Sequence, residues 1–352
     1  MLQFDKKSAL VQLGHFLHQF GATTPTKNPA VLHNELFFDR MIGQIESAQH
    51  YNGWFTPEQM RYALQSWAQA LTENNLTTWL QPYDFSTTQP KTVGLVLAGN
   101  IPLVGFHDVL SVLVSGHKAL VKTSSNDQIM VPFLVDYLIA CEPRIADYIT
   151  FTEGKLEGFE AVIATGSNNT ARYFEYYFKD KPSIIRKNRN SVAVLDGTET
   201  KEDLMQLGED IFRYFGLGCR NVSKLFVPEG YSFDPFFAAM YTYKDCIQYD
   251  KYANNYDYNK AVFLMSLFSI LDNGFLTLKE DSGYASPISS IFYEYYSDLS
   301  VVQERLEREK DQLQCIVSKG IVTDSIPFGK TQRPELWDYA DHVDTLAFLQ
   351  TI

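Results

Sequence analysis

The 352-residue sequence is poor in the residues that build disulfide scaffolds and metal sites. It has only four cysteines, none of them in a Cys-x-x-Cys pair or beside a histidine at metal-ligand spacing. A structural zinc and a disulfide framework are therefore both disfavoured, and no metal site is predicted. A chain of this kind fits a reducing cytoplasm.

Basic charge is also scarce. The chain has 30 Lys+Arg against 42 Asp+Glu, a formal charge of −12, which argues against nucleic acid as a partner because phosphate backbones need a basic face. The start, Met1 to Lys7, lacks the basic-then-apolar order of a signal peptide. One apolar stretch, Thr92 to Gly116, has the length of a membrane span, but Asn100 and Asp108 near its middle are costly in hydrocarbon. We expect strand, turn and helix there instead, and no membrane span.

Internal repeats, low-complexity tracts and the common phosphate fingerprints are absent as well. Neither G-x-G-x-x-G nor a Walker A sequence occurs. Apolar residues make up 45% and charged residues 20% of the chain, an ordinary globular composition. The length predicts two domains, each with its own core.

Short apolar runs alternate with helical patterns over the middle of the chain. Thr56-Pro57 marks the start of a helix in a mainly helical region that extends to about residue 90. The alternation beyond it predicts an α/β fold with a mostly parallel sheet. Strands are expected at 92–98, 118–122, 160–165, 191–195 and 222–227, and helices at 104–115, 127–140, 168–178 and 201–214.

The last stretch, Val343 to Ile352, is apolar and is expected to dock on the core. One form of docking is an edge strand that completes a sheet, in this chain or in the second subunit of a homodimer.

Cys219 is the first candidate for chemistry. It lies between a predicted helix and a predicted strand, with Gly216 and Gly218 before it and Arg220 after it. Glycines let a backbone bend tightly, and a nearby guanidinium favours the thiolate, which is the nucleophilic form. The alternative is an apolar cysteine that packs at the end of a strand.

Asn100 is the second candidate. It follows a buried parallel strand, the place where open α/β sheets bind ligands, and its amide is able to donate to an oxyanion. The alternative is a turn residue, because Gly-Asn and Ile-Pro are ordinary turn sequences.

Two further segments close a strand and open a helix: Lys122-Thr-Ser-Ser125 and Thr165-Gly-Ser167. Helix N-termini offer free N–H groups and a positive dipole end, which suit a nucleotide phosphate. Each segment taken alone is equally well explained as a helix N-cap.

In order and together, these segments resemble the aldehyde dehydrogenase superfamily, and within it the LuxC-type acyl-CoA reductases. The resemblance extends from about residue 90 to the end of the chain. It is carried by Leu97-Ala-Gly-Asn-Ile-Pro-Leu103, Ser115-Gly-His-Lys-Ala-Leu-Val-Lys-Thr-Ser-Ser125, Ala164-Thr-Gly-Ser167, Gly216-Leu-Gly-Cys219, Pro327-Phe-Gly-Lys-Thr-Gln332 and Asp338-Tyr-Ala-Asp341.

The resemblance implies a role for each matching position. Cys219 corresponds to the acyl-accepting nucleophile and Asn100 to the oxyanion-binding amide. Lys122 corresponds to the lysine that contacts the adenosine ribose. Cofactor contacts are implied at Lys122, Thr123, Ser124, Ser125, Thr165, Gly166 and Ser167.

The resemblance also implies a division of the chain. Residues 1–90 are then a helical region packed on the cofactor domain, 91–210 the dinucleotide-binding domain, 211–326 the catalytic domain, and 327–352 a segment that returns to the core or to a dimer interface.

Two departures from the superfamily pattern are informative. No Asp or Glu occurs between Asp180 and Asp196, where hydrolytic members carry the glutamate that activates water. A thioacyl enzyme without it should persist until hydride arrives. The basic residues in that stretch, Arg186, Lys187 and Arg189, are expected either in a solvated loop or on a phosphate.

The second departure is Ser125, which stands where NAD-preferring relatives often carry a glutamate. Serine tolerates a 2′-phosphate that a carboxylate would repel, so NADPH is predicted in preference to NADH. Gly283-Tyr-Ala-Ser-Pro287 is the nearest match to the motif on the nicotinamide side, but glycine replaces its acid, so no contact is assigned there.

The sequence therefore predicts NADPH-dependent reduction of an acyl-CoA or acyl-carrier thioester to an aldehyde through a Cys219 thioester. The resemblance implies a fatty acyl substrate. Aromatic residues between Phe233 and Tyr258 are expected in a tunnel for the chain or, more often, in core and interface. Two alternatives stay open: a cysteine-dependent acyltransferase with a vestigial cofactor site, and a non-catalytic scaffold of an acyl-processing complex.

Overall fold

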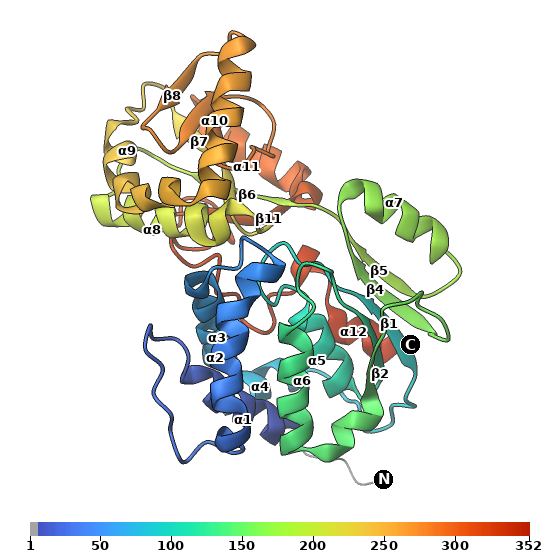
Figure 1. The fold of residues 1–352 in the computed structure, drawn as a ribbon. Coiled ribbons are helices and arrows are strands. Elements are labelled where there is room, and N and C mark those ends of the chain that lie inside the picture. Colours follow the sequence, from blue (N-terminus) through green and yellow to red (C-terminus); the bar gives the residue numbers. More distant parts are fainter. Residues whose placement is uncertain (1–5) are drawn as a thin grey trace. The chain divides into compact units, whose positions relative to one another are not determined.

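The structure of the protein, a computed structural model, describes residues 6–352 (Figure 1). The absence of a signal peptide is predicted from Met1 to Lys7, and residues 1–5 of this segment lie outside the described residues. The chain divides into two compact units, the first formed by residues up to 187 together with 335–352, the second by residues 188–334.

The first unit begins with four helices, in agreement with the predicted helical region. The predicted start of the third is confirmed, because Thr56 Oγ1 accepts a hydrogen bond from the backbone N–H of Gln59 and Pro57 is the first helical residue. The four are α1 (Lys6–His18), α2 (Asn34–Tyr51), α3 (Pro57–Ala70) and α4 (Glu73–Leu80).

A five-stranded, wholly parallel sheet follows, which we call sheet A. Its strand order is β3-β2-β1-β4-β5, so the order reverses between β1 and β4. The elements are β1 (Thr92–Val96), α5 (Phe106–Ser115), β2 (Lys118–Lys122), α6 (Met130–Cys141), η1 (Pro143–Tyr148), β3 (Ile149–Phe151), β4 (Ala161–Thr165), α7 (Asn168–Tyr177), β5 (Ser183–Arg186) and, from the end of the chain, η5 (Ala340–His342) and α12 (Thr345–Thr351).

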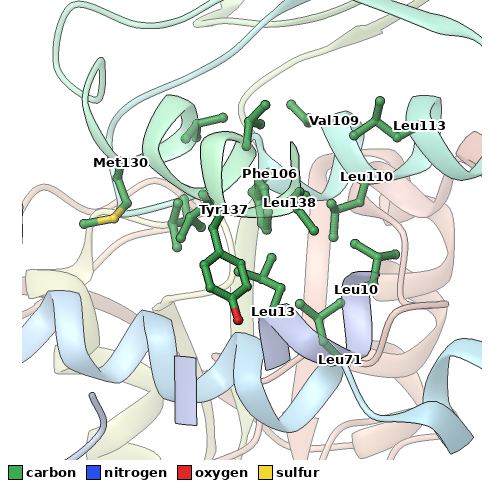
Figure 2. Packing of buried hydrophobic residues seen from close by; sticks show 14 of the residues in the cluster. Leu10, Leu13, Leu71, Phe106, Val109, Leu110, Leu113, Met130, Tyr137 and Leu138 are labelled. Carbon is green, nitrogen blue, oxygen red and sulfur yellow. The ribbon is translucent and has the colours of Figure 1, made fainter. Parts of the chain in front are cut away.

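One hydrophobic core joins the N-terminal helices to the helices of sheet A. Figure 2 shows Leu10 and Leu13 of α1 directed at residues of α5 and α6, among them Phe106 and Tyr137. The Tyr137 ring also stacks on Phe16, with 4.2 Å between the ring centroids. Because these side chains are fully buried, the helices before residue 90 and the sheet are parts of one packed body.

The second unit contains sheet B, a six-stranded sheet with the order β11-β6-β7-β10-β9-β8, parallel except where β8 pairs with β9. Its elements are β6 (Asn190–Val194), α8 (Lys201–Phe212), η2 (Arg213–Gly216), β7 (Val222–Pro228), α9 (Asp234–Met240), η3 (Tyr241–Gln248), α10 (Asp250–Met265), β8 (Ile270–Asp272), β9 (Thr277–Glu280), β10 (Ser290–Tyr296), α11 (Leu299–Arg308), η4 (Lys310–Gln312) and β11 (Leu313–Ser318).

The predicted α/β class with a parallel sheet is confirmed. The boundary between the compact units lies at 187/188, whereas the functional division predicted from the sequence lies at 210/211. The difference arises because β6 pairs with β7 and β11 in sheet B and with no strand of sheet A. The chain thus enters its second unit one strand and one helix earlier than the alternation suggests.

The end of the chain docks as a helix and not as an edge strand. α12 lies beside α5 in Figure 1, where its red ribbon marks the C-terminal end of the sequence. Leu346 and Leu349 are fully buried, and the imidazole of His117 is hydrogen-bonded to the Leu349 carbonyl at 2.8 Å. The edge-strand form of docking was therefore wrong, because the apolar residues follow helical and not alternating spacing.

A buried ion pair fastens this helix to the sheet. Arg186, the last residue of β5, pairs with Asp108 of α5 and donates a hydrogen bond to Thr345 Oγ1 of α12 at 2.8 Å. Arg186 and Asp108 are 5% and 3% exposed, so both charges have left water. Both expectations for Arg186, a solvated loop and a phosphate contact, are wrong, since its guanidinium serves the interior of the first unit.

Arg186→Met should destabilise the first unit by about 3–5 kcal/mol, because it leaves the Asp108 carboxylate buried without its counter-charge. Urea denaturation followed by circular dichroism measures the loss. The double variant Asp108→Leu/Arg186→Met is the control and should recover most of it, since an apolar pair needs no compensation. A double variant as unstable as the single one would contradict this account.

Candidate active site

Three of the candidate segments lie at one edge of sheet A. β2, β1 and β4 are neighbours with parallel pairing, for example Val96 with Lys122 and Val96 with Ala164. The backbone N–H of Leu97 continues the ladder by donating to the Lys122 carbonyl at 3.0 Å. The carboxyl ends of the three strands therefore present the Asn100, Lys122–Ser125 and Thr165–Ser167 segments side by side. Two of these strands, β1 and β4, flank the point where the strand order reverses, which is where such sheets bind ligands.

The Lys122–Ser125 segment presents hydrogen-bond donors at this edge. Lys122 Nζ donates to the Gly154 carbonyl at 2.8 Å, which holds the ammonium group beside the end of β2. Thr123 and Ser124 are partly exposed and Ser125 is exposed. The segment itself contains no acid, and the carboxylate of Asp127, two residues after it, is buried, so the segment exposes an ammonium and hydroxyl groups.

The Thr165–Ser167 segment begins α7. Ser167 is the N-cap of the helix, with its Oγ accepting from the Thr170 N–H at 3.3 Å, so the capping interpretation holds for this residue. Gly166 lies against the helix that follows: a Cβ at this position would stand 3.0 Å from the Thr170 side chain. A cofactor contact by the segment stays a prediction.

Asn100 is exposed in the loop between β1 and α5. The loop is tied at two places. Asn52 Nδ2 donates to the Gly99 carbonyl at 3.1 Å, and the Leu103 N–H donates to Asp127 Oδ2 at 3.0 Å. Sequence reasoning missed Asn52 and Asp127, because each acts through a backbone group far away in the sequence.

Cys219 lies in the second unit, at the end of an unusual turn between α8 and β7. Tyr214, Phe215 and Gly216 follow one another in the left-handed region, with φ of 53°, 57° and 79°. Such a conformation is costly for a tyrosine or a phenylalanine and is found most often at functional sites. The Phe215 ring is anchored by stacking on Tyr249, with 4.8 Å between centroids.

Two buried polar side chains, those of Asn221 and Ser191, hold the Cys219 turn by hydrogen bonds to its backbone. Asn221 Nδ2 donates to carbonyls at the end of α8, including that of Arg213 at 2.8 Å, while its Oδ1 accepts from the Gly218 N–H at 2.8 Å. Ser191 Oγ donates to the Cys219 carbonyl at 2.8 Å and accepts from the Cys315 N–H at 3.1 Å. The turn is thus held by Ser191 of β6 at Cys219 and by Asn221, the residue before β7, at Gly218.

Of the other three cysteines, Cys315 is buried, whereas Cys141 and Cys246 are partly buried, as Cys219 is. Cys315 of β11 is 4% exposed, and the Arg220 guanidinium lies 3.5 Å from its sulfur. Burial raises the pKa of the Cys246 thiol to about 12 and also raises the pKa of Cys141. Among residues 6–352, no cluster of three or more His, Cys, Asp or Glu side chains is arranged to hold a metal ion.

The aromatic segment before Tyr258 is partly core. Phe233, Phe236, Tyr252 and Tyr256 are buried, and the Tyr252 hydroxyl donates to the Phe275 carbonyl at 3.1 Å. Packing explains these rings, in line with the more frequent of the two roles expected for them.

The stretch that lacks a carboxylate is structured. β5 and β6 cover most of it, and Arg186 is buried as described above. Lys187 pairs with Glu175 at the surface, and Arg189 Nη1 donates to the Leu313 carbonyl at 3.2 Å. None of these contacts supplies a general base.

No part of residues 6–352 forms a helix that is both long and apolar enough to cross a membrane. The Thr92–Gly116 stretch is strand, turn and helix, as predicted, with Gly116 ending α5 at a φ of 90°.

Several solved structures with the same fold are aldehyde dehydrogenases. The chain superposes on aldehyde dehydrogenase 21 from Physcomitrella patens with a TM-score of 0.63 and 12% identity, over 99% of this chain and 87% of that one. A benzaldehyde dehydrogenase from Corynebacterium glutamicum gives a TM-score of 0.61 and 12% identity, over 91% and 79%. An NADP-dependent enzyme from E. coli gives 0.61 and 12%, over 90% and 73%. The fold is that of the aldehyde dehydrogenases.

Residues 40–236, more than half of the chain, match the LuxC family of acyl-CoA reductases. The protein therefore belongs to this family of enzymes, and the resemblance seen in the sequence motifs is confirmed. No curated protein matches the sequence.

Limited alkylation should distinguish the four cysteines. With substoichiometric iodoacetamide at pH 8, we expect label on Cys219 first, because Cys315 is buried and burial raises the pKa of the Cys141 and Cys246 thiols, which disfavours their thiolates. Peptide mass spectrometry reads the order of labelling, with Cys219→Ser as the control that should take up little label. Earlier labelling of Cys246 or Cys315 would count against a reactive Cys219.

Proposed function

We propose that the protein reduces an acyl thioester, as acyl-CoA or bound to an acyl carrier, to the aldehyde with NADPH. The observation that carries the proposal is the Cys219 turn. A family of acyl-CoA reductases needs an acyl-accepting nucleophile, and the candidate cysteine stands in a strained, polar-anchored turn. By contrast, Cys315 is buried, and burial raises the pKa of the Cys141 and Cys246 thiols. Membership of the family supports a reductase over an acyltransferase or a scaffold.

The Lys122–Ser125 segment fits a nicotinamide dinucleotide. Its exposed groups are one ammonium and several hydroxyls, which suit ribose hydroxyls and phosphate. It follows β2, the neighbour of β1, at the carboxyl edge of sheet A on which the reversal between β1 and β4 also lies. Lys122, Thr123, Ser124 and Ser125 would hold the adenosine end, and Thr165, Gly166 and Ser167 the pyrophosphate. When bound, the cofactor supplies a hydride to the carbonyl carbon of the acyl-enzyme.

Cys219 carries the acyl group in this scheme. Its thiolate attacks the thioester carbonyl carbon, and the oxyanion accepts hydrogen bonds from the Asn100 amide and the Cys219 backbone N–H. The C–S bond to the carrier breaks and the carrier leaves as a thiol. After reduction, the C–S bond to Cys219 breaks, the aldehyde departs and the thiolate is restored.

The absence of a carboxylate between Asp180 and Asp196 protects the acyl-enzyme. Without the general base that hydrolytic relatives carry in this stretch, water is a poorer competitor for the thioester. The structured β5–β6 stretch, whose basic side chains are engaged elsewhere, offers no substitute.

Cys219→Ala should abolish acyl labelling of the protein by a radiolabelled fatty acyl-CoA, because the attacking sulfur is gone. Intact-protein mass spectrometry after mixing without NADPH provides the measurement. Cys141→Ala, which removes a packed thiol, is the matched control and should label normally. Undiminished labelling of the Cys219 variant would refute the nucleophile.

NADPH should be used with a higher kcat/KM than NADH. Ser125→Glu should lower kcat/KM for NADPH at least about tenfold, because a carboxylate repels the 2′-phosphate, and should affect NADH little. Ser125→Ala is the control and should keep the preference. Steady-state rates at the absorbance band of the reduced nicotinamide give both ratios, and equal or better use of NADH by the parent protein would disprove the assignment.

A further inference from the structure

The loop that carries Asn100 is strained and would not hold its conformation unaided. Leu103, three residues after Asn100, has a φ of 59°, in the left-handed region that a leucine rarely adopts. Such a residue persists only where its surroundings over-determine it. The groups that hold the loop therefore decide where the Asn100 amide points.

Asp127 is one of these groups. Its Oδ2 accepts the Leu103 N–H at 3.0 Å, and its own N–H donates to the Ser124 carbonyl at 3.0 Å. The residue is 5% exposed, and its Oδ1 is buried without a hydrogen-bond partner. Burial raises the pKa of this carboxyl to about 6. Burying a carboxylate with so few hydrogen-bond donors costs free energy of folding. The Asp127 carboxylate nevertheless accepts the N–H of Leu103, the strained residue of the loop.

Asn52 holds the other side of the loop. It ends α2, is 7% exposed, and its Nδ2 donates to the Gly99 carbonyl at 3.1 Å, next to Asn100. Its Oδ1 accepts from the Trp54 N–H at 3.1 Å, which fixes the orientation of the amide. The N-terminal helices thereby reach the candidate site through one side chain.

The same loop is packed on the predicted cofactor segment. A Cβ on Gly99 would stand 2.6 Å from the Ser124 Oγ, so any other residue at position 99 would collide with the Ser124 side chain. The loop that carries the exposed Asn100 is thus held before this residue, by Asn52 bonded to Gly99, and after it, by Asp127 bonded to Leu103.

We propose that Asp127 and Asn52 are positioning residues that fix the Asn100 amide for oxyanion binding, with Asp127 acting through Leu103 and Asn52 through Gly99. The proposal rests on the role assigned to Asn100 under the proposed function. Through Asn52, the helical region before residue 90 would contribute to catalysis, although no sequence motif in that region indicates such a role.

A double-mutant cycle on acyl-enzyme formation tests this proposal. Quenched-flow mixing with dodecanoyl-CoA in the absence of NADPH, read by intact-protein mass, gives the acylation rate constant and its dependence on substrate concentration. We expect Asp127→Ala to lower the rate constant about 10- to 100-fold with little change in half-saturation, because misplaced groups cost rate more than binding. In an Asn100→Ala background the same change should cost less than about twofold.

Two matched variants sharpen the cycle. Asp127→Asn keeps an oxygen acceptor for the Leu103 N–H and should restore most of the rate. Asp136→Ala removes an exposed aspartate of α6 and should behave as the parent. If Asp127→Ala does not fold, Asn52→Ala carries the same cycle from the other side of the loop.

The outcomes distinguish a failure of the proposed function from a failure of the positioning role. Absence of acylation in the parent protein, or a full rate in Asn100→Ala, contradicts the proposed function and removes the basis of this inference. A slow Asn100→Ala with fully multiplicative losses from Asp127→Ala and Asn52→Ala overturns the positioning role alone, because independent effects multiply.

Discussion

The parallel pairing of β1 with both β2 and β4 is the constraint on which the first unit depends. It aligns the carboxyl ends of three strands, so segments that are 20 to 70 residues apart in the sequence emerge at one edge. The strand order reverses between β1 and β4, so no connection runs directly from β1 to β4 across the carboxyl edge of the sheet. Helix packing, the loop of Asn100 and the segment after Lys122 are all built around this arrangement.

Much of the fold could be predicted because local pattern and tertiary environment agree. The run at Thr92–Val96 is apolar because β1 is buried within the first unit. Gly116 ends α5 in the left-handed region, which glycine adopts more readily than other residues. The errors occur where the tertiary environment overrides local chemistry. The residues around Arg186 in the sequence have the composition of a surface loop, yet Arg186 is buried. Its partners Asp108 and Thr345 lie 78 and 159 residues away, so the local sequence does not indicate them.

The candidate site shows the same limit. Cys219, Asn100 and the segments after β2 and β4 stand out in the sequence because glycines and strand ends mark them. The residues that hold them do not. Asn221 and Ser191 satisfy backbone groups of the Cys219 turn, and Asn52 and Asp127 do so for the Asn100 loop, all through contacts that depend on the completed fold. No spacing rule identifies such partners from a single sequence.

The return of the chain to its first unit also bears on how the protein is made. Residues 335–352 complete a body whose other residues precede 188, while residues 188–334 form one continuous stretch. During synthesis the later unit has its whole sequence before the earlier one does. Arg186 gains its contact with Thr345, and His117 its contact with the Leu349 carbonyl, only after residues 345–349 have been synthesised. The first unit therefore receives its last residues after the whole of the second unit has been synthesised.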